Sequence, residues 1–393
     1  MHETADVVVI GAGIHGTSLA FHLAQRGLAV AVVDREAVAA GATGVSSGWV
    51  RMHYDLLAES RLAWQSFPYF AEWADRVGGD CGFTRTGFLR IVSPERADAL
   101  RSNVARQKAI GIPTEVVSAK EIRDLVPEFV CDDDEVAAYE PLSGYADPTS
   151  AAMSFMAAAR ALGARLATGR EVSSVRVDKG RVSGVETSQG FIAAGIVVNA
   201  AGVGAAHVGA LAGVDVPVAA WEEDMAFTTR PAPDGRSLPC VLDSRLGISV
   251  RPEGRELLLI GMEDASRFPA DIPRDLPVVA AGFVEEVVDR VWRRLPWLEN
   301  ASLVRAFSGR DGVSPDQRPI LGPAGPQGFY LACGFSGTGF KVAPAVGACM
   351  AELICDGQSR TADISMFSPD RFTRGELLTG EDSYGPLWRG TDT

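Results

Sequence analysis

The first 34 residues contain the feature that most constrains the fold of this chain. An apolar run, Asp6–Ile10, is followed at once by the glycine-rich sequence Gly11-Ala-Gly13-Ile-His-Gly16. Apolar residues then recur at helical spacing over 17–26, and a second apolar run, 28–33, leads to Asp34. This order predicts a strand, a tight turn, a helix and a second strand, the unit that opens a parallel sheet in α/β proteins.

Each glycine of this turn has its own physical task in a dinucleotide-binding fingerprint. Gly11 permits the tight turn, Gly13 lets the backbone approach a pyrophosphate, and Gly16 allows the helix to pack closely on the strand. The helix N-terminus then offers N–H groups and partial positive charge to the phosphates. A carboxylate at Asp34 can bind ribose hydroxyls and disfavours a 2′-phosphate, so NAD or FAD is predicted rather than NADP. We expect His15, inside the turn, to be exposed.

The loop after Asp34 helps to distinguish between the two dinucleotides. Residues 41–48 are all small, with the sequence GATGVSSG. A loop of this kind can pass close to the ribityl chain and ring of a flavin, and this favours FAD.

Length and composition limit the remaining possibilities. The chain has 393 residues and a formal net charge of −13, which indicates two or three domains and argues against nucleic acids and anionic membranes as partners. Six cysteines without a CxxC pair fit reduced thiols and give no zinc or other metal site. No secretory signal or membrane span is visible, so a cytoplasmic protein is expected.

The rest of the chain alternates predicted helices and strands. An acidic run, Cys131–Glu135, lacks the spacing of a calcium loop and is expected to be solvated. Residues 216–314 are richer in proline and charge, which indicates a second domain. The predicted helices are 57–73, 94–110, 119–126, 148–162, 205–212, 278–294 and 343–355, and the predicted strands are 83–92 (as a pair), 172–177, 182–186, 191–198 and 329–332.

Four stretches give the chain a family resemblance. They are GAGIHGTSLAFHLAQRG with VVDRE, then VRMHY, then EVSSVRV with VVNAAG, and finally SPDQRPILGP with GFYLACGFSGTGFKVAPAVG. In this order they resemble the D-amino acid oxidase-type family of FAD enzymes, nearest the glycine oxidase and sarcosine oxidase β-subunit branch. The resemblance covers roughly residues 5–360.

The resemblance implies an α/β fold in two parts. A glutathione-reductase-like, Rossmann-type FAD-binding domain would comprise residues 1–80, 145–215 and 315–365. A substrate domain with a large mixed β-sheet would comprise 81–144 and 216–314, and 366–393 would form a C-terminal tail. The positions that match FAD contacts of the family are Gly11, Gly13, Gly16, Asp34, Arg35, Thr43, Ser46, Ser47, Val172, Ala201, Gly202, Gly334, Gly337, Gly339, Phe340 and Lys341.

Two further matches concern the substrate. Arg51 and Lys341 align with a basic pair that holds the substrate carboxylate in sarcosine oxidase-like enzymes. The residues alone favour the same interpretation, because Lys341 is one of four lysines and lies in an apolar glycine turn, where a buried cation needs an anion. The alternative is that the two cations pair with protein carboxylates such as Glu59, or with the cofactor.

Some positions depart from the family pattern. Gly309 and the segment Ser46–Trp49 stand where relatives attach flavin covalently, so we expect FAD to be non-covalent. Ser249 best matches a lysine that promotes the reaction with oxygen in monomeric sarcosine oxidases. If Glu222 or Glu223 faces the cavity, it could bind a substrate ammonium; otherwise this acidic stretch is a solvated turn.

The expected reaction is FAD-dependent oxidation of a carboxylate-bearing amine, secondary (N-methyl) or cyclic, to an imine. Hydride would pass to flavin N5 and the electrons then to O2. His53 and Tyr54 would make polar contacts, lower the pKa of the amine, or pack behind Arg51. The alternatives are a dehydrogenase of amino or 2-hydroxy acids that passes electrons to a partner protein or quinone, and a flavin subunit of a larger complex.

Overall fold

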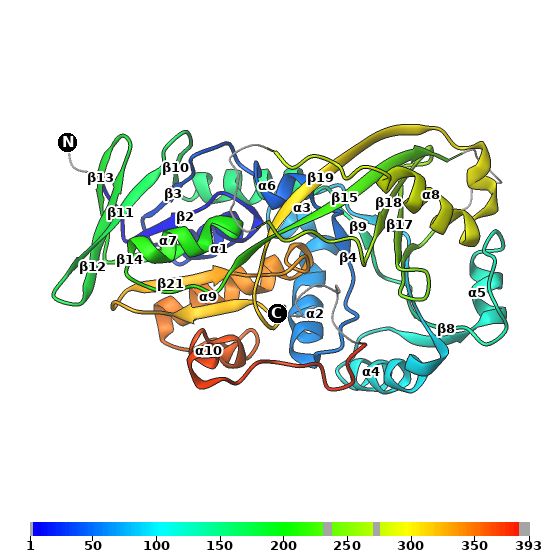
Figure 1. Ribbon diagram of the computed structural model, residues 1–393. Coiled ribbons are helices and arrows are strands. Elements are labelled where there is room, and N and C mark those ends of the chain that lie inside the picture. Colours follow the sequence, from blue (N-terminus) through cyan, green and yellow to red (C-terminus); the bar gives the residue numbers. More distant parts are fainter. Residues whose placement is uncertain (1–2, 231–237, 270–275, 385–393) are drawn as a thin grey trace.

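The fold is given by a computed structural model that describes residues 3–230, 238–269 and 276–384. Its centre is a six-stranded sheet in which five strands are parallel and β20 is antiparallel at one edge. Helices α1 (Ile14–Gln25), α6 (Pro148–Ala161) and α9 (Ala343–Asp356) pack together beside this sheet (Figure 1). The strand order is β10 (Arg165–Ala167), β3 (Val30–Val33), β2 (Val7–Ile10), β14 (Ile196–Asn199), β21 (Phe329–Cys333) and β20 (Ile320–Pro323).

The composition of β2 explains its central place. All four of its residues, Val-Val-Val-Ile, are buried. Continuous β-branched residues suit a strand that is covered on both faces, as parallel strands are. The fingerprint turn therefore leaves the carboxyl end of a strand in the middle of the sheet.

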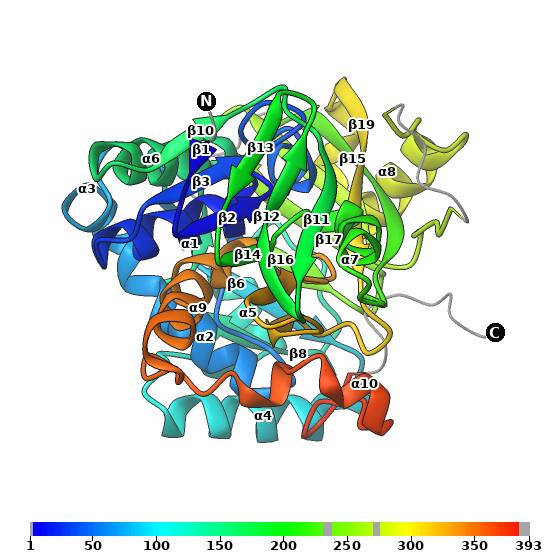
Figure 2. The same cartoon turned by 90° about the vertical axis from the view of Figure 1, so that its left-hand side faces the viewer.

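A four-stranded sheet lies at one end of the molecule (Figures 1 and 2). The predicted strand 191–198 is wrong as a single element, because the chain divides it between this sheet and the central one. The break falls at Ala194-Gly195, after which β14 joins β2. The four strands are β1 (Glu3–Thr4), β13 (Gly190–Ala193), β12 (Arg181–Thr187) and β11 (Val172–Asp178), and α7 (Ala205–Leu211) follows β14.

A second large sheet has eight strands and mixed direction, since β16 and β6 are parallel and every other pair is antiparallel. Two strands of 11 residues, β15 and β19, run from this sheet toward the parallel sheet (Figure 1). The strand order is β19 (Leu303–Val313), β15 (Ala219–Thr229), β18 (Leu257–Met262), β17 (Ile248–Glu253), β16 (Cys240–Asp243), β6 (Phe88–Val92), β8 (Val136–Glu140) and β7 (Glu115–Ser118).

The two faces of the eight-stranded sheet differ in composition. The face here called the outer face carries apolar residues such as Val250 and Ile260, which pack with α8 (Phe283–Arg294). The opposite, inner face is the one to which strand register assigns Phe88, Ser249 and Met225. By the same register the inner face also carries Arg90 of β6, which lies opposite Leu242 beside Ser249.

The remaining helices and strands are short or lie at the periphery. Three predicted helices begin at other positions than expected: α1 begins at Ile14 rather than 17, α4 at Ala97 rather than 94, and α8 at Phe283 rather than 278. The other elements are α2 (Leu57–Ala71), α3 (Trp73–Arg76), α4 (Ala97–Ala109), α5 (Ala119–Leu125), α10 (Asp370–Arg374) and a small sheet of β4 (Trp49–Val50), β9 (Gly144–Tyr145) and β5 (Thr84–Arg85).

The prediction of an α/β chain with a Rossmann-type parallel sheet and a large mixed sheet is confirmed. Within the described ranges, no helix has the length and apolar character needed to cross a membrane. The same part of the chain holds no group of three or more His, Cys, Asp or Glu side chains arranged for a metal ion.

Candidate active site

The fingerprint turn fits against the central sheet so tightly that it requires glycine at two positions. Gly11 has a φ of +113°, and a Cβ built there would lie 2.3 Å from the carbonyl oxygen of Ala200. A Cβ on Gly16 would lie 1.9 Å from the carbonyl oxygen of Gly11. The turn therefore packs closely against the residues that follow β14, and the start of α1 packs closely against the residues that follow β2.

Asp34 and Thr43 border the N-terminus of α1. The carboxylate of Asp34 accepts hydrogen bonds from the N–H of Ala12 at 2.6 Å and of Glu36 at 2.8 Å. Burial raises the pKa of Asp34, and these bonds oppose that rise. The hydroxyl of Thr43 accepts from the N–H of Ile14 at 3.0 Å. The predicted acid and the predicted loop therefore meet at the helix end.

The other predicted cofactor positions lie at different depths. Gly202 follows β14 with a φ of +55°, and a Cβ there would meet no atom within 4 Å. Ser46 and Ser47 are half-buried in the small-residue loop, whereas Arg35 is exposed. Val172 is buried in the apolar core beneath the sheet.

The C-terminal glycine turn, residues 334–341, packs against the fingerprint. The ring of His15 stacks on Phe335 with ring centroids 3.4 Å apart. A Cβ at Gly339 would lie 2.8 Å from Nε2 of His15. The expectation that His15 is exposed is therefore wrong: the ring is half-buried, and burial lowers its pKa to about 3.

Arg51, Tyr54 and Lys341 come together beside this turn. The guanidinium of Arg51 lies 4.6 Å from the centre of the Tyr54 ring, and the ammonium of Lys341 lies 5.8 Å from it. The hydroxyl of Tyr54 donates to the carbonyl of Thr338 at 3.2 Å. The Tyr54 ring is thus close to both cations, and its hydroxyl ties the segment 51–54 to the glycine turn.

Both cations are buried without a carboxylate partner. Arg51 is 8% exposed and Lys341 is 6% exposed. Among the residues that the structure describes, no carboxylate lies within salt-bridge distance of either group; Arg51 donates to the carbonyl of His53. Glu59, the alternative partner, instead pairs with Arg318, which also bonds Asp55 at 2.9 Å. Within the described residues, these two buried cationic groups are therefore open to an anionic ligand.

The electrostatics of this pair have a clear physical cause. Burial, and then the nearby charge of Arg51, lower the pKa of Lys341 well below its ordinary value. A bound carboxylate would act in the opposite direction and stabilise the ammonium form. The charge state of Lys341 is thus coupled to occupancy by an anion.

His53 joins this cluster to the C-terminal segment. Its Nε2 lies 2.8 Å from the hydroxyl of Tyr384, and the two rings stack. Burial and the charges of Arg51 and Arg90 lower the pKa of His53 to about 3, so the imidazole is neutral at neutral pH. Its carbonyl, rather than its ring, contacts Arg51.

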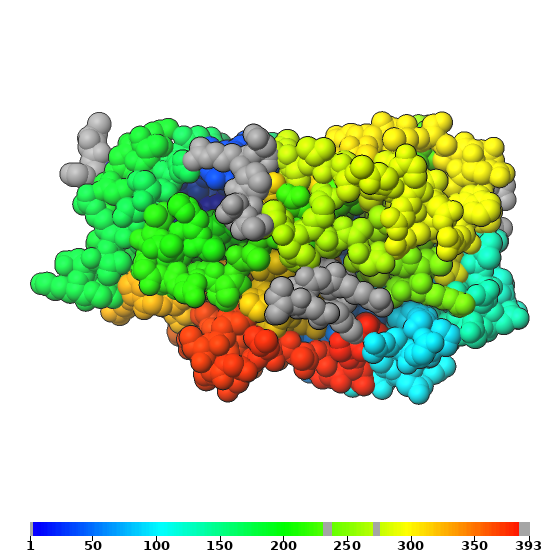
Figure 3. Space-filling model, in the orientation of Figure 1, coloured from blue at the N-terminus to red at the C-terminus, as the bar shows by residue number. Residues whose placement is uncertain are grey.

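Tyr384 is the site residue that the sequence reasoning missed. The stretch after α10 runs along the lower side of the molecule as far as α4 (Figure 3), where Glu381 accepts from the N–H of Leu57 at 2.9 Å. Asp382 pairs with Arg106 there. The sequence signal was faint, because a tyrosine in a mixed tail has no periodicity that could place it.

The acidic stretch of β15 divides between the two faces of the eight-stranded sheet. Glu222 bonds Arg310 at 2.7 Å, and Asp224 bonds Arg267. Glu223 alternates with them and lies on the inner face, beside Gly309 of β19. Ser249 also lies on this face, next to Gly261 of β18.

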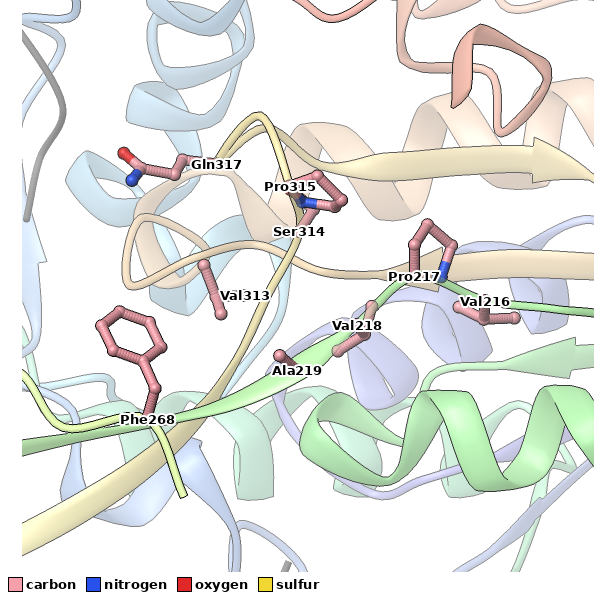
Figure 4. Close-up of a pocket in the computed structure, with 9 residues that line it drawn as sticks. All are labelled: Val216, Pro217, Val218, Ala219, Phe268, Val313, Ser314, Pro315 and Gln317. Atoms are coloured by element: carbon pink, nitrogen blue, oxygen red, sulfur yellow. The ribbon is translucent and has the colours of Figure 1, made fainter. Parts of the chain in front are cut away.

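A pocket of about 360 Å³ lies where β15 begins and β19 ends (Figure 4). Its lining is mostly apolar and includes Val218, Phe268 and Val313. Neither Arg51 nor Lys341 lines it. The chemistry-bearing groups, rather than this pocket, locate the candidate site.

Comparison with known proteins assigns the chain to a family. The model of the family described as "FAD dependent oxidoreductase" (DAO) matches residues 6–353. The chain belongs to this family. Its cofactor is FAD, and the predicted resemblance is confirmed.

Individual relatives agree with this assignment. The chain is 32% identical to the mitochondrial sarcosine dehydrogenase of Homo sapiens over 371 residues, and 28% identical to the glycine oxidase of Geobacillus kaustophilus over 381. These matches cover 91% and 94% of the chain, but 40% of the first relative and 98% of the second. The solved structure of L-proline dehydrogenase from P. horikoshii has a TM-score of 0.89 and 29% identity, covering 96% of this chain and all of that one.

The residues at the nucleotide end fit FAD. A Cβ would fill the open space at Gly202, and at Gly13 it would meet the Thr43 hydroxyl at 3.2 Å. A pyrophosphate would be held at the N-terminal end of α1, where a helix offers N–H groups to an anion. Gly11, Gly13, Asp34 and Thr43 are the residues that would hold the adenosine and pyrophosphate.

Proposed function

We propose that this chain oxidises an amine that carries a carboxylate, of the secondary or cyclic amino-acid type, to an imine. The observation that carries the proposal is the pair of buried cations, Arg51 and Lys341, with no carboxylate partner in the described chain. The names of the relatives support it, because sarcosine, glycine and proline all carry a carboxylate on the carbon next to nitrogen.

The residues of the site would act mainly by binding and orientation. Arg51 and Lys341 fix the carboxylate from two directions, which restricts the rotation of a small amino acid. The ring of Tyr54 lies close to both cations, and its hydroxyl is fixed by the hydrogen bond to the carbonyl of Thr338. The carbonyl of His53 keeps the Arg51 guanidinium in place.

Bound FAD would supply the acceptor for a hydride from the carbon next to nitrogen. Non-covalent binding is part of the proposal, because Gly309 has no side chain and a Cβ there would meet Val45 of the small-residue loop at 2.8 Å. Residues 1–80, 145–215 and 315–365 would form the FAD-binding part, and 81–144 with 216–314 the substrate part.

Anaerobic titration tests the proposal. The purified holoprotein is mixed with N-alkyl, cyclic and primary amino acids, and the flavin absorbance near 450 nm (an approximate value for free flavin) is followed. We expect bleaching by at least one secondary or cyclic amino acid. Bleaching by none of the panel, with FAD bound, would contradict the proposed function.

The electron acceptor has two candidates. The proposed reaction passes the electrons to O2. A specific observation favours a dehydrogenase that passes them to a protein or quinone instead: the inner-face position on β17 that best matches the oxygen-promoting lysine of some relatives is Ser249, which places no cation there. Stopped-flow reoxidation of the reduced protein in air distinguishes them, since a rate no faster than that of free reduced flavin excludes the oxidase.

A further inference from the structure

Glu223 is the acidic residue of β15 whose side chain lies on the inner face of the eight-stranded sheet. Successive residues of a strand point to opposite faces. Glu222 lies on the other face, where it bonds Arg310 at 2.7 Å and lies 3.5 Å from Arg267. Met225, two residues after Glu223, pairs with Gly261, which pairs in turn with Ser249. Register therefore places Glu223 on the face that also carries Phe88.

That face is also the face of the cation pair. The guanidinium of Arg51 lies 5.5 Å from the centre of the Phe88 ring. The residue paired with Glu223 on the neighbouring strand β19 is Gly309. A Cβ built on Gly309 would lie 2.8 Å from the side chain of Val45 in the small-residue loop. Asp311, two residues along β19 on the same face, accepts from the N–H of Gly337 in the turn that carries Lys341. Glu223 thus lies where the Lys341 turn and the small-residue loop both meet the inner face.

The other acids near Glu223 already have partners. Glu263 pairs with Arg90 at 2.9 Å. Asp311 accepts from the N–H groups of Gly312 and Gly337 at 2.7 and 2.8 Å. The carboxylate of Glu223 makes no hydrogen bond or ion pair with any residue in the described ranges, although it is half-buried. An unpaired carboxylate that interacts with the charge of Lys341, on the face that Arg51 also approaches, gives the site both a negative and a positive group.

We propose that Glu223 binds the ammonium of the substrate and accepts its proton, while Arg51 and Lys341 hold the carboxylate at the other end. This inference rests on the proposed function and narrows it to zwitterionic amino acids. The step moves one proton from nitrogen to a Glu223 oxygen and no electrons. It leaves a nitrogen lone pair, which the loss of hydride from the neighbouring carbon to FAD requires.

The surroundings of Glu223 suit a proton acceptor. Burial, followed by the charges of Glu263, Asp311 and Asp224, raises its pKa to about 8, and Lys341 acts in the opposite direction. Glu263, Asp224 and Asp311 are themselves compensated by Arg90, Arg267 and backbone N–H groups. Because ionised Glu223 is the acceptor, the rate of flavin reduction should rise as the pH rises through about 8.

The matched variants are Glu223→Gln and Glu222→Gln, neighbours on one strand with side chains on opposite faces. Two pairs of ligands serve as probes: L-proline with tetrahydro-2-furoate, and N-methylglycine with methoxyacetate. In each pair an ether oxygen replaces the amine. Anaerobic reduction is measured with the amino acids, and the dissociation constants of the ethers are measured from the perturbation of the flavin spectrum.

We expect Glu223→Gln to slow reduction by about 100-fold, the usual scale of a lost proton acceptor, and to remove the rise with pH. Binding of the ethers, which carry no ammonium, should stay as in wild type, and Glu222→Gln should reduce at the wild-type rate. Reduction of Glu223→Gln at the wild-type rate, or equal weakening of ethers and amino acids, would overturn this inference alone. If neither amino acid reduces the wild-type flavin, the proposed function fails, and this inference fails with it.

Discussion

The nucleotide end and the substrate face of this protein are built by different means. At the nucleotide end, close backbone contacts decide the structure, as where a Cβ at Gly11 would lie 2.3 Å from the Ala200 oxygen. On the inner face of the eight-stranded sheet, side-chain charges decide it, since Arg51, Lys341 and Glu223 come from three segments distant in sequence. Backbone constraints within one short segment can be recognised in a sequence, whereas charges that meet across the fold cannot.

If charges hold the substrate half together, the largest effect on stability should come from Arg294. This buried residue bonds Glu135 at 2.7 Å and Asp243 at 2.6 Å. Arg294→Ala removes the buried guanidinium from both carboxylates, leaving Glu135 the more exposed Arg245 as its ion-pair partner and Asp243 its backbone N–H groups, and should lower the free energy of unfolding by about 3 kcal/mol. Urea denaturation measures this, with exposed Arg293→Ala as the control, expected to cost less than about 1 kcal/mol. Equal effects of the two variants would contradict a charge-built sheet.

The same cluster gives a dependence on pH. Burial alone would raise the pKa of Glu135, but the hydrogen bonds from Arg294 and Cys131 outweigh burial and lower it. A lowered pKa means that ionised Glu135 stabilises the folded protein. This contribution is fully present above the unfolded pKa of about 4.3 and is lost as the pH falls through the pKa of the folded state. The difference in unfolding free energy between wild type and Glu135→Gln should therefore shrink as the pH is lowered from 7 to 3.

The cation pair should give the next largest effect, on binding. Arg51→Ala and Lys341→Ala should each weaken the binding of a carboxylate-bearing amine by about 2–4 kcal/mol. FAD content should stay the same in both, and exposed Lys179→Ala should change neither quantity. Dissociation constants from flavin spectra measure the effect. Loss of flavin from the two variants would mean instead that these residues serve the cofactor.

Gly11→Ala tests the nucleotide end, where close backbone contacts decide the structure. Its positive φ and the clash with β14 should lower the free energy of unfolding by about 2–3 kcal/mol and reduce FAD content. Gly27→Ala is the control, because Gly27 also has a positive φ but its Cβ would meet no atom within 4 Å. The control should cost about 1 kcal/mol. Similar losses in both would show that conformational strain, and not the contact with Ala200, governs this turn.

The smallest effect should come from Tyr384→Phe. The change removes one hydrogen bond to His53 and should lower the free energy of unfolding by about 1 kcal/mol. Tyr330→Phe is the control, since the Tyr330 hydroxyl bonds no residue of the described chain. A loss no greater than that of the control would show that the tail does not support the site.

Particular residues show which parts of the site can be predicted from the sequence and which cannot. The glycines and Asp34 could be placed because their roles follow from one strand, one turn and one helix. Lys341 could be singled out because a lysine in an apolar glycine turn is conspicuous. His15 could not be placed, because its stacking partner Phe335 lies 320 positions away. Glu222 and Glu223 could not be separated, because the register of β15 against β19 decides which of them faces inward.

The acidic run before β8 shows the same limit. Its composition predicted a solvated loop, and Asp133 is indeed exposed. Glu135, however, is 2% exposed and bonded by Arg294, so the expectation is wrong for this residue. The arginine that decides its burial lies on α8, more than 150 residues later.

The most direct test of the central claim compares each amino acid with the amine that lacks its carboxylate. L-proline is paired with pyrrolidine, and N-methylglycine with dimethylamine, in anaerobic reduction of the wild-type flavin and of Arg51→Ala. We predict that at least one amino acid reduces the wild-type flavin much faster than its paired amine and that Arg51→Ala abolishes the difference. An amine that reduces the wild-type flavin as fast as its amino acid would contradict a site built around a substrate carboxylate.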